Sequence, residues 1–174
     1  MVNDSEIEKI LNIKNDRKFR IVCESTLQLI GCGTTRTVYK LNDTLVLKVA
    51  NRKYGYIQNI SEYDVFCKYK NLKIFANIFN KDDNGLWIIQ SLATPLNIND
   101  NDFKQILKVV NHVETSKHYY SNNLFLNNLY TFLKTININY LHDFKKCDSY
   151  GKINNELCII DYSMNNEDFD NKLK

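Results

Sequence analysis

Residues 29–50 read LIGCGTTRTVYKLNDTLVLKVA, and this stretch decides the fold class. Two short runs rich in apolar and β-branched residues, TVYKL and TLVLKVA, flank Asn42 and Asp43, which is typical of a β-hairpin. Ahead of them, Gly31 and Gly33 interrupt a run that otherwise alternates as a strand does. The stretch therefore predicts antiparallel strands with a glycine-containing turn.

The two glycines have a structural and a functional interpretation. In the structural one, G-x-G is a flexible place in a hairpin. In the functional one, a turn without Cβ atoms approaches a phosphate and directs amide N–H groups at it, while Val38 on the returning strand covers a nucleotide base. A dinucleotide-binding fold is excluded, because no helix follows the glycines directly. The turn alone leaves both interpretations open.

Further strand and helix patterns surround this stretch. DSEIEKILNI (residues 4–13) predicts a short helix, and FRIVCESTLQLI (residues 19–30) predicts another strand. NISEYDVFCKYKNL (residues 59–72) predicts a helix with one buried stripe formed by Ile60, Tyr63, Phe66, Cys67, Tyr69 and Lys70. KIFANIFN and LWIIQSL flank the turn KDDNG and predict a second hairpin over residues 73–92.

After Pro95 the pattern changes to helix. Residues 100–114 and 122–136 each carry apolar side chains at spacings of three and four, as amphipathic helices do. INNELCIIDYS (residues 153–163) predicts a strand pair around Asn154 and Asn155. The order of elements favours an α+β bilobal plan with a hinge near residues 91–97.

Composition argues against several classes of protein. The 23 basic and 20 acidic residues are spread along the chain, so we expect no nucleic-acid partner. Five scattered cysteines lack C-x-x-C pairs, which favours reduced thiols in a cytoplasmic protein over a disulfide scaffold or a zinc site. No apolar run approaches the roughly 18–20 residues of a membrane span, and the start MVNDSEIEK is not a signal peptide.

Lys48 stands between apolar neighbours in VLKVA. It either points to solvent through simple alternation or serves as a cation for phosphate oxygens, held in place by a carboxylate. Glu62, in the predicted helix, is a candidate for that carboxylate, although a glutamate in a first helical turn is also favoured by the helix dipole.

Two later segments carry further candidates. In YLHDFKKCD (residues 140–148), Asp143, Lys145 and Asp148 form a charged connecting loop, or else a group that accepts a hydroxyl proton, neutralises phosphate and holds a metal. In ELCIIDYS (residues 156–163), Asp161 is either a turn initiator or a carboxylate for Mg²⁺.

In this order, these segments resemble the protein-kinase-like superfamily over residues 29–163. IGCGTTRTVYKL is similar to its glycine-rich loop, VLKVA to the strand with the phosphate-binding lysine, and Glu62 to the helix glutamate that pairs with it. LWIIQSL is similar to the last N-lobe strand and hinge, LHDFKKCD to the catalytic loop H-R-D-L-K-x-x-N, and IIDYS to D-F-G. Residues 46–66 are also similar to small kinase-like proteins of phages and mobile elements.

The resemblance implies a bilobal fold with a five-stranded antiparallel N-lobe (residues 1–93) and a reduced, mainly helical C-lobe (residues 94–174). It implies phosphoryl transfer from Mg-ATP to a Ser/Thr hydroxyl of a protein. The alternative that it leaves open is a kinase-like module with little or no turnover that acts by engaging a partner protein.

The resemblance also implies a role for each matching residue. The roles are phosphate binding by Gly31, Gly33 and Lys48, orientation of Lys48 by Glu62, adenine contact by Val38 and by backbone groups of Gln90 to Leu92, proton acceptance by Asp143, γ-phosphate contact by Lys145, and Mg²⁺ binding by Asp148 and Asp161.

The chain departs from the family pattern at several places. Arg36 stands where the third glycine usually does, and its side chain either reaches a phosphate or crowds the turn. Leu141 and His142 occupy the H-R places, Asp148 replaces asparagine, and Ser163 replaces the D-F-G glycine. The residues after Asp161 are too few for the activation segment and helical subdomain of typical protein kinases.

Overall fold

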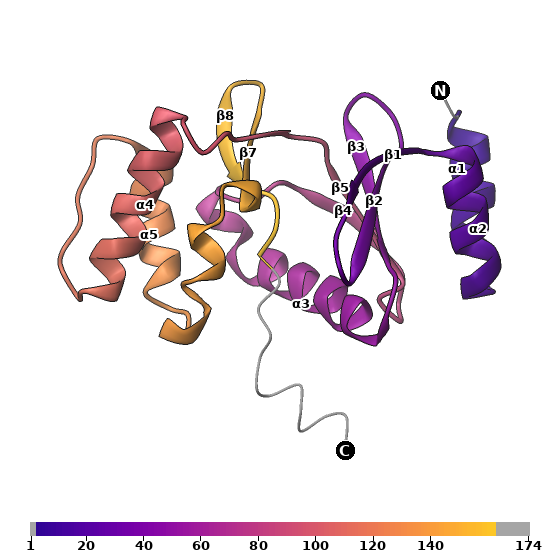
Figure 1. The fold of residues 1–174 in the computed structure, drawn as a ribbon, viewed down its shortest axis with the longest axis horizontal. Helices are drawn as coiled ribbons and strands as arrows, with labels where there is room; N and C mark the ends of the chain where they lie inside the picture. Colours follow the sequence, from indigo (N-terminus) through magenta and orange to yellow (C-terminus); the bar gives the residue numbers. More distant parts are fainter. Residues whose placement is uncertain (1–2, 163–174) are drawn as a thin grey trace, which may run out of the picture. The chain divides into compact units, whose positions relative to one another are not determined.

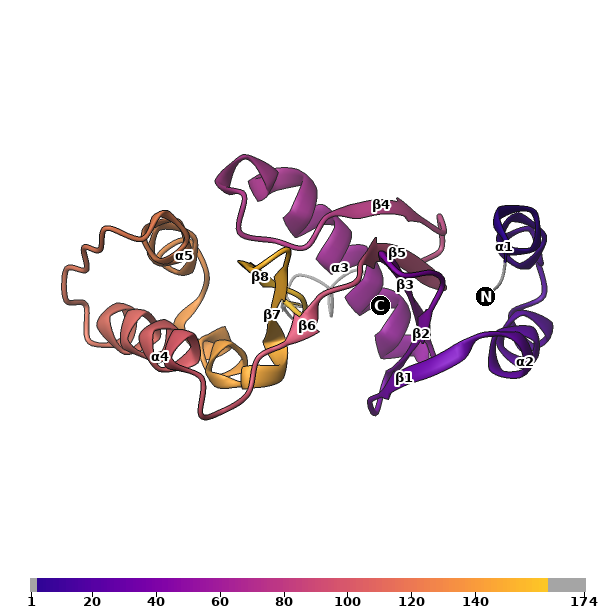
Figure 2. The same cartoon turned by 90° about the horizontal axis from the view of Figure 1, so that it is seen from above.

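A computed structural model of the chain describes residues 3–162, which divide into two compact units (Figure 1 and Figure 2). Unit 1 comprises the chain up to Tyr63 together with Asn77–Leu92. Unit 2 comprises Asp64–Ala76 and the chain from Ala93 onward. Within residues 3–162, no helix combines the length and the apolar character needed to cross a membrane.

Unit 1 contains a five-stranded antiparallel sheet with the order β1-β2-β3-β5-β4. Its strands are β1 (Gln28–Cys32), β2 (Arg36–Lys40), β3 (Leu45–Ala50), β4 (Ile78–Lys81) and β5 (Trp87–Ser91). The predicted α+β class and the predicted five-stranded antiparallel sheet are thereby confirmed.

The central strand β3 is covered on both faces. Leu47 and Val49 face the helices α1 (Asp4–Leu11) and α2 (Asp16–Thr26), which Figure 1 shows on one side of the sheet. The core on this side consists of Ile10, Phe19, Cys23, Leu27, Tyr39, Leu41, Leu47, Val49, Leu86, Trp87 and Ile89. Helix α3 (Lys53–Tyr69) contacts the opposite face, so every residue of β3 after Leu45 is buried.

The prediction of a strand over residues 19–30 is wrong for most of that segment, since only Gln28–Cys32 form a strand. The Asn15 side chain accepts a hydrogen bond from the Lys18 amide (2.8 Å) and caps a helix that continues to Thr26. Phe19 and Cys23, four residues apart, are both fully buried on one helix face. The same apolar residues also fit a two-residue alternation, which made the pattern ambiguous.

The predicted buried stripe of the third helix is also wrong in part. Helix α3 begins at Lys53, and Cys67 and Lys70 of the predicted stripe are exposed. The residues of α3 that are buried are Gly55, Asn59, Ser61, Glu62 and Val65. Polar side chains are buried here because their hydrogen-bonding groups have partners, which an apolar periodicity does not reveal.

Unit 2 contains two neighbouring helices, α4 (Asn101–Glu114) and α5 (Leu124–Leu133), both predicted (Figure 2). Its small sheet has the order β6-β7-β8, formed by β6 (Thr94–Pro95), β7 (Tyr150–Ile153) and β8 (Glu156–Ile159). The hairpin β7–β8 was predicted, and its turn residues Asn154 and Asn155 have φ values of 52° and 66°, which asparagine tolerates.

The segment after α3 joins this small sheet within unit 2. The Ile159 amide donates to the Ile74 carbonyl (2.7 Å), and the Ala76 amide donates to the Ile159 carbonyl (2.9 Å). Ser163, which stands at the place of the D-F-G glycine, lies outside the described residues.

We expect Phe19→Ala to lower the free energy of unfolding of unit 1 by about 3–5 kcal/mol, because it empties a fully buried site. Ile21→Ala is the matched control on the same helix, where the side chain is 55% exposed, and should cost about 0.5 kcal/mol or less. Urea unfolding followed by the fluorescence of Trp87, the one tryptophan of the chain and a member of this core, measures both. Residues 19 and 21 would share a face in a strand, so similar losses for the two variants would contradict the helix.

Candidate functional site

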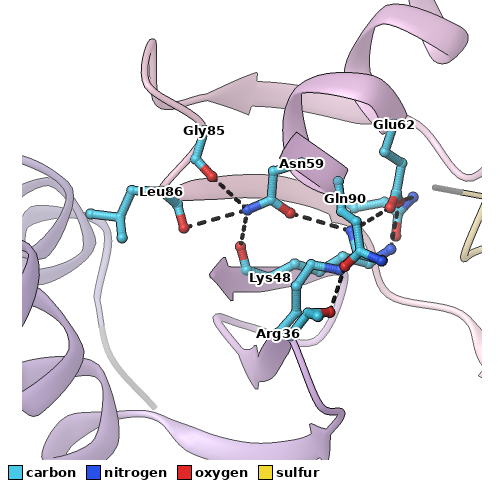
Figure 3. A network of polar contacts seen from close by, with 9 residues as sticks. Arg36, Lys48, Asn59, Glu62, Gly85, Leu86 and Gln90 are labelled. Carbon is cyan, nitrogen blue, oxygen red and sulfur yellow. Dashed lines mark hydrogen bonds and ion pairs between the residues drawn. The ribbon is translucent and has the colours of Figure 1, made fainter. Parts of the chain in front are cut away.

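A buried carboxylate organises the polar face of unit 1. Glu62 is fully buried, and its Oε1 accepts hydrogen bonds from Lys48 Nζ (2.5 Å) and Gln90 Nε2 (3.1 Å) (Figure 3). Its Oε2 accepts from Arg36 Nη1 (2.5 Å). Together with Asn59, these residues are called the Glu62 cluster below.

The sheet register brings the three donors to one face. Arg36 pairs with Ala50, Val38 with Lys48, and Val46 with Gln90 across neighbouring strands. Directly paired residues of adjacent strands point to the same face, and alternate residues of β3 (Val46, Lys48 and Ala50) also share a face. Strands β2, β3 and β5 therefore each contribute one donor to the Glu62 cluster.

Asn59 attaches α3 to the sheet at a second point. Its side-chain amide donates to the carbonyls of Gly85 (2.8 Å) and Leu86 (3.4 Å), and lies 3.5 Å from the Lys48 carbonyl. Its Oδ1 accepts from Arg36 Nη1 (3.3 Å). Asn59 and Glu62 are three residues apart and therefore lie on the same face of the helix.

Lys48 is only 6% exposed, so the interpretation in which it points to solvent is wrong. Burying a charge is costly unless a partner of opposite charge and further hydrogen bonds compensate for it. The Glu62 carboxylate does so for Lys48 and fixes the direction of its side chain.

The five glycines of the chain divide into two groups. A Cβ atom at Gly55, Gly85 or Gly151 would come within 3.0 Å of backbone atoms, and Gly85 also has a φ of +83°. These three glycines are required by packing or backbone conformation.

Gly31 and Gly33 have no such requirement. A Cβ atom at Gly31 would lie 3.7 Å from the Val38 Cβ, and one at Gly33 would lie 3.5 Å from the Arg36 carbonyl oxygen. Both are ordinary contacts, and neither glycine has a positive φ. Neither packing nor backbone conformation therefore requires glycine at these two positions.

Val38 lies between the glycines and Lys48. It pairs with Gly31 on one side and with Lys48 on the other, and it is half-buried. The structure therefore brings four of the sequence-predicted residues, Gly31, Val38, Lys48 and Glu62, to adjoining positions of unit 1.

The residues predicted to contact adenine have their own partners. The Leu92 amide donates to the Thr44 carbonyl (2.7 Å), and the Ser91 amide donates to the Asn77 carbonyl (2.9 Å). Neither amide is therefore available to an adenine ring. Gln90 is 1% exposed, and its side chain belongs to the Glu62 cluster.

In unit 2, the residues of the catalytic-loop-like segment form ion pairs. Asp143 accepts from Lys146 Nζ (2.6 Å) and lies 3.2 Å from His142 Nε2. Lys145 Nζ contacts Glu114 Oε1 on α4 (2.6 Å). The structure thus pairs both Asp143 and Lys145 with charged side chains of the same unit.

Backbone hydrogen bonds to Ser149 link the segment that contains Asp148 to the segment that contains Asp161. The Ser149 carbonyl accepts from the amides of Ile160 (2.8 Å) and Asp161 (3.3 Å), which places the end of the last hairpin beside Asp148. The hydrogen bond to Asp143 raises the pKa of the Lys146 ammonium, and the charges of Asp148 and Asp161 contribute to that rise.

Carboxylates of two aspartates together with phosphate oxygens and water form a usual Mg²⁺ environment. Both aspartates are solvent-exposed. Among residues 3–162 no group of three or more His, Cys, Asp or Glu side chains is arranged to hold a metal.

Three members of the Glu62 cluster were not predicted as such. The sequence pattern does not identify Asn59, predicts only a backbone role for Gln90, and allows two orientations of the Arg36 side chain. The structure shows that the Arg36 guanidinium reaches Glu62 and Asn59. The signal for Asn59 was its position three residues before Glu62 in a predicted helix, since two polar residues at that spacing share a face.

Comparison of the chain with models of protein families, with curated proteins and with solved structures finds no match.

We expect Gly31→Ala and Gly33→Ala to change the free energy of unfolding by less than about 1 kcal/mol, since neither added Cβ meets a close contact. Gly85→Ala should cost at least about 2 kcal/mol, because its φ is positive and its Cβ would lie 2.5 Å from the Tyr56 carbonyl oxygen. Urea unfolding of the three single variants checks the contrast. A loss at Gly31 or Gly33 as large as that at Gly85 would show that these glycines serve the fold.

We expect Glu62→Gln to lower the stability of unit 1 by about 3–5 kcal/mol, because it removes the carboxylate that two buried cations contact. Asp64→Asn is the matched control, an exposed acid two residues later on the same helix, and should change stability by about 0.5 kcal/mol or less. Thermal or urea unfolding measures both. Equal, small effects would contradict a central role for the Glu62 carboxylate.

Proposed function

We propose that the chain is an ATP-binding, protein-kinase-like protein that transfers the γ-phosphoryl group of Mg-ATP to a Ser/Thr hydroxyl of a protein. The observation that carries the proposal is the buried pair between Lys48 Nζ and Glu62 Oε1, 2.5 Å apart, which joins the central strand of the sheet to α3. The proposal includes the kinase-like fold itself and a cytoplasmic location. All five cysteines are thiols, in keeping with such a location.

The position of the glycines relative to Lys48 supports phosphate binding. Gly31, Val38 and Lys48 are paired across three neighbouring strands, so the backbones of Gly31 and Lys48 are separated by two strand spacings, about 10 Å. A triphosphate lying against the turn would contact the Lys48 ammonium. The Gly33 amide already donates to the Arg36 carbonyl (2.8 Å), so hydrogen bonds from the turn to phosphate would come from its other amides. Val38, between them, offers an apolar surface to a base.

The residues of unit 2 receive their roles from the sequence resemblance. Asp143 would accept the proton of the attacking hydroxyl as the new O–P bond forms and the bond to the ADP oxygen breaks. Asp148 and Asp161 would hold Mg²⁺, which neutralises phosphate charge when bound. Lys145 would contact the γ-phosphate, for which it has to leave Glu114.

A second candidate function is a kinase-like module that engages a partner protein without turnover. The ion pairs Asp143–Lys146 and Lys145–Glu114 favour it, because the two groups assigned to the transfer step already contact other charged side chains. The hydrogen bond from the Leu92 amide to the Thr44 carbonyl favours this candidate as well, because it leaves one backbone donor fewer for an adenine ring.

We expect the wild-type chain to bind Mg-ATP and to phosphorylate a protein acceptor or itself. Lys48→Met should weaken Mg-ATP binding at least about tenfold, because it removes the phosphate-contacting cation, whereas Lys40→Met, on the neighbouring strand, should not. The double variant Gly31→Ala/Gly33→Ala should weaken binding while it changes the free energy of unfolding by less than about 2 kcal/mol. Isothermal titration calorimetry of folded variants measures these affinities.

Transfer of radiolabelled phosphate from ATP tests the reaction itself. Asp143→Asn should reduce the transfer rate at least about a hundredfold while Mg-ATP binding persists, because only the proton acceptor is lost. Binding of Mg-ATP without any transfer in the wild-type chain favours the second candidate. Absence of Mg-ATP binding in the wild-type chain contradicts the proposed enzyme.

A further inference from the structure

Arg36 contacts both the glycine-containing turn and helix α3 of unit 1. Its carbonyl accepts a hydrogen bond from the Gly33 amide (2.8 Å), which closes the glycine turn, defined here as residues 31–36. Its guanidinium donates to Glu62 (2.5 Å) and to Asn59 (3.3 Å) on α3. Arg36 is 7% exposed, so it is a buried residue that contacts the turn through its backbone and α3 through its side chain.

The neighbouring residue of the glycine turn also contacts α3. Thr35 Oγ1 donates to Gln58 Oε1 (2.5 Å), and the Thr35 carbonyl accepts from the Asn51 amide (2.7 Å). Gly55, in the first turns of α3, allows this approach, because a Cβ atom there would lie 2.3 Å from the Thr35 carbonyl oxygen. Two consecutive residues of the glycine turn are therefore held by the helix as well as by the sheet.

The Glu62 carboxylate divides its two oxygens between the glycine turn and the lysine. Oε1 accepts from Lys48, and Oε2 accepts from Arg36. A movement of α3 that draws this carboxylate away breaks both contacts together. The planar guanidinium suits this geometry, because it presents several donors in a fixed arrangement to Glu62 and Asn59.

We propose that Arg36 is a positioning residue that couples the glycine turn to α3, so that the turn and the Lys48 ammonium take up their nucleotide-binding positions together. This rests on the proposed function and concerns how the same site is assembled. The arginine at the third position of the glycine pattern thereby has a role that does not require it to touch a phosphate.

Amide hydrogen exchange of the full chain without nucleotide tests the coupling. Arg36→Gln removes the charged contact while Glu62 retains Lys48 and Gln90. The Gly33 amide should then exchange about tenfold faster or more, relative to the Leu92 amide, which is held by Thr44 in the same unit. Lys40→Gln, a cation on the same strand that pairs with Asp43, should leave this ratio unchanged. An unchanged ratio in Arg36→Gln overturns the proposal.

If Arg36→Gln does not fold, Arg36→Lys carries the test, because it keeps a cation near Glu62 but loses the planar fork. The ratio of exchange at Gly33 to that at Leu92 should then rise about threefold or more. If this ratio in Arg36→Lys equals that of the wild-type chain, the proposal is overturned.

Calorimetry with Mg-ATP separates this proposal from the proposed function. At a temperature where the variant is folded, Arg36→Gln should raise the Kd for Mg-ATP about tenfold or more, and Arg36→Lys should recover part of that loss. A merely structural role lowers the unfolding midpoint and leaves this Kd unchanged. Absence of binding in the wild-type chain contradicts the proposed function, whereas wild-type binding with an unchanged Kd in Arg36→Gln contradicts the positioning role.

Discussion

The Glu62 carboxylate is the constraint on which unit 1 depends. It has no exposed surface, and a buried carboxylate is costly unless its oxygens receive good hydrogen bonds and an opposite charge. Those donors come from three strands, through Arg36, Lys48 and Gln90. Their convergence fixes where α3 lies on the sheet, and it also fixes the strand register, because a shift by one residue would turn a donor to the other face.

The two faces of the sheet in unit 1 have different chemistry. The face toward α1 and α2 is apolar and supplies the hydrophobic core, whereas the face toward α3 carries the Glu62 cluster. This separation lets the polar face hold charged residues without interrupting the core. The glycines follow a similar division, since Gly55 and Gly85 are required by the packing of α3, whereas Gly31 and Gly33 are not required by any neighbour.

Much of this architecture could be predicted because its signals are local. The hairpins around Asn42–Asp43 and Asn154–Asn155 carry turn residues between strand-like runs, and α4 carries a clear helical period. Most of helix α2 was predicted as a strand, because Phe19 and Cys23 fit both a helical and an alternating pattern. The two-residue strand β6 has no pattern of its own and exists only through its pairing with β7.

Residues of the site could be predicted only where the residue type was unusual for its local sequence. A lysine within VLKVA suggested Lys48, and its spacing to a helical glutamate suggested Glu62. The partnership of Arg36, Asn59 and Gln90 depends on strand register and on the close approach of α3 near Gly55, and neither is encoded in a short stretch of sequence. Buried polar residues are difficult to predict for this reason, because their burial depends on partners that are distant in the chain.

Covalent labelling with an acyl-phosphate derivative of ATP tests most directly whether Lys48 contacts nucleotide phosphates. A lysine amine near the bound phosphates attacks the acyl group and releases ATP, and peptide mass spectrometry identifies the acylated residue. We expect Lys48 to be acylated and excess Mg-ATP to suppress this labelling. Labelling confined to exposed lysines, with no protection by Mg-ATP, would contradict it.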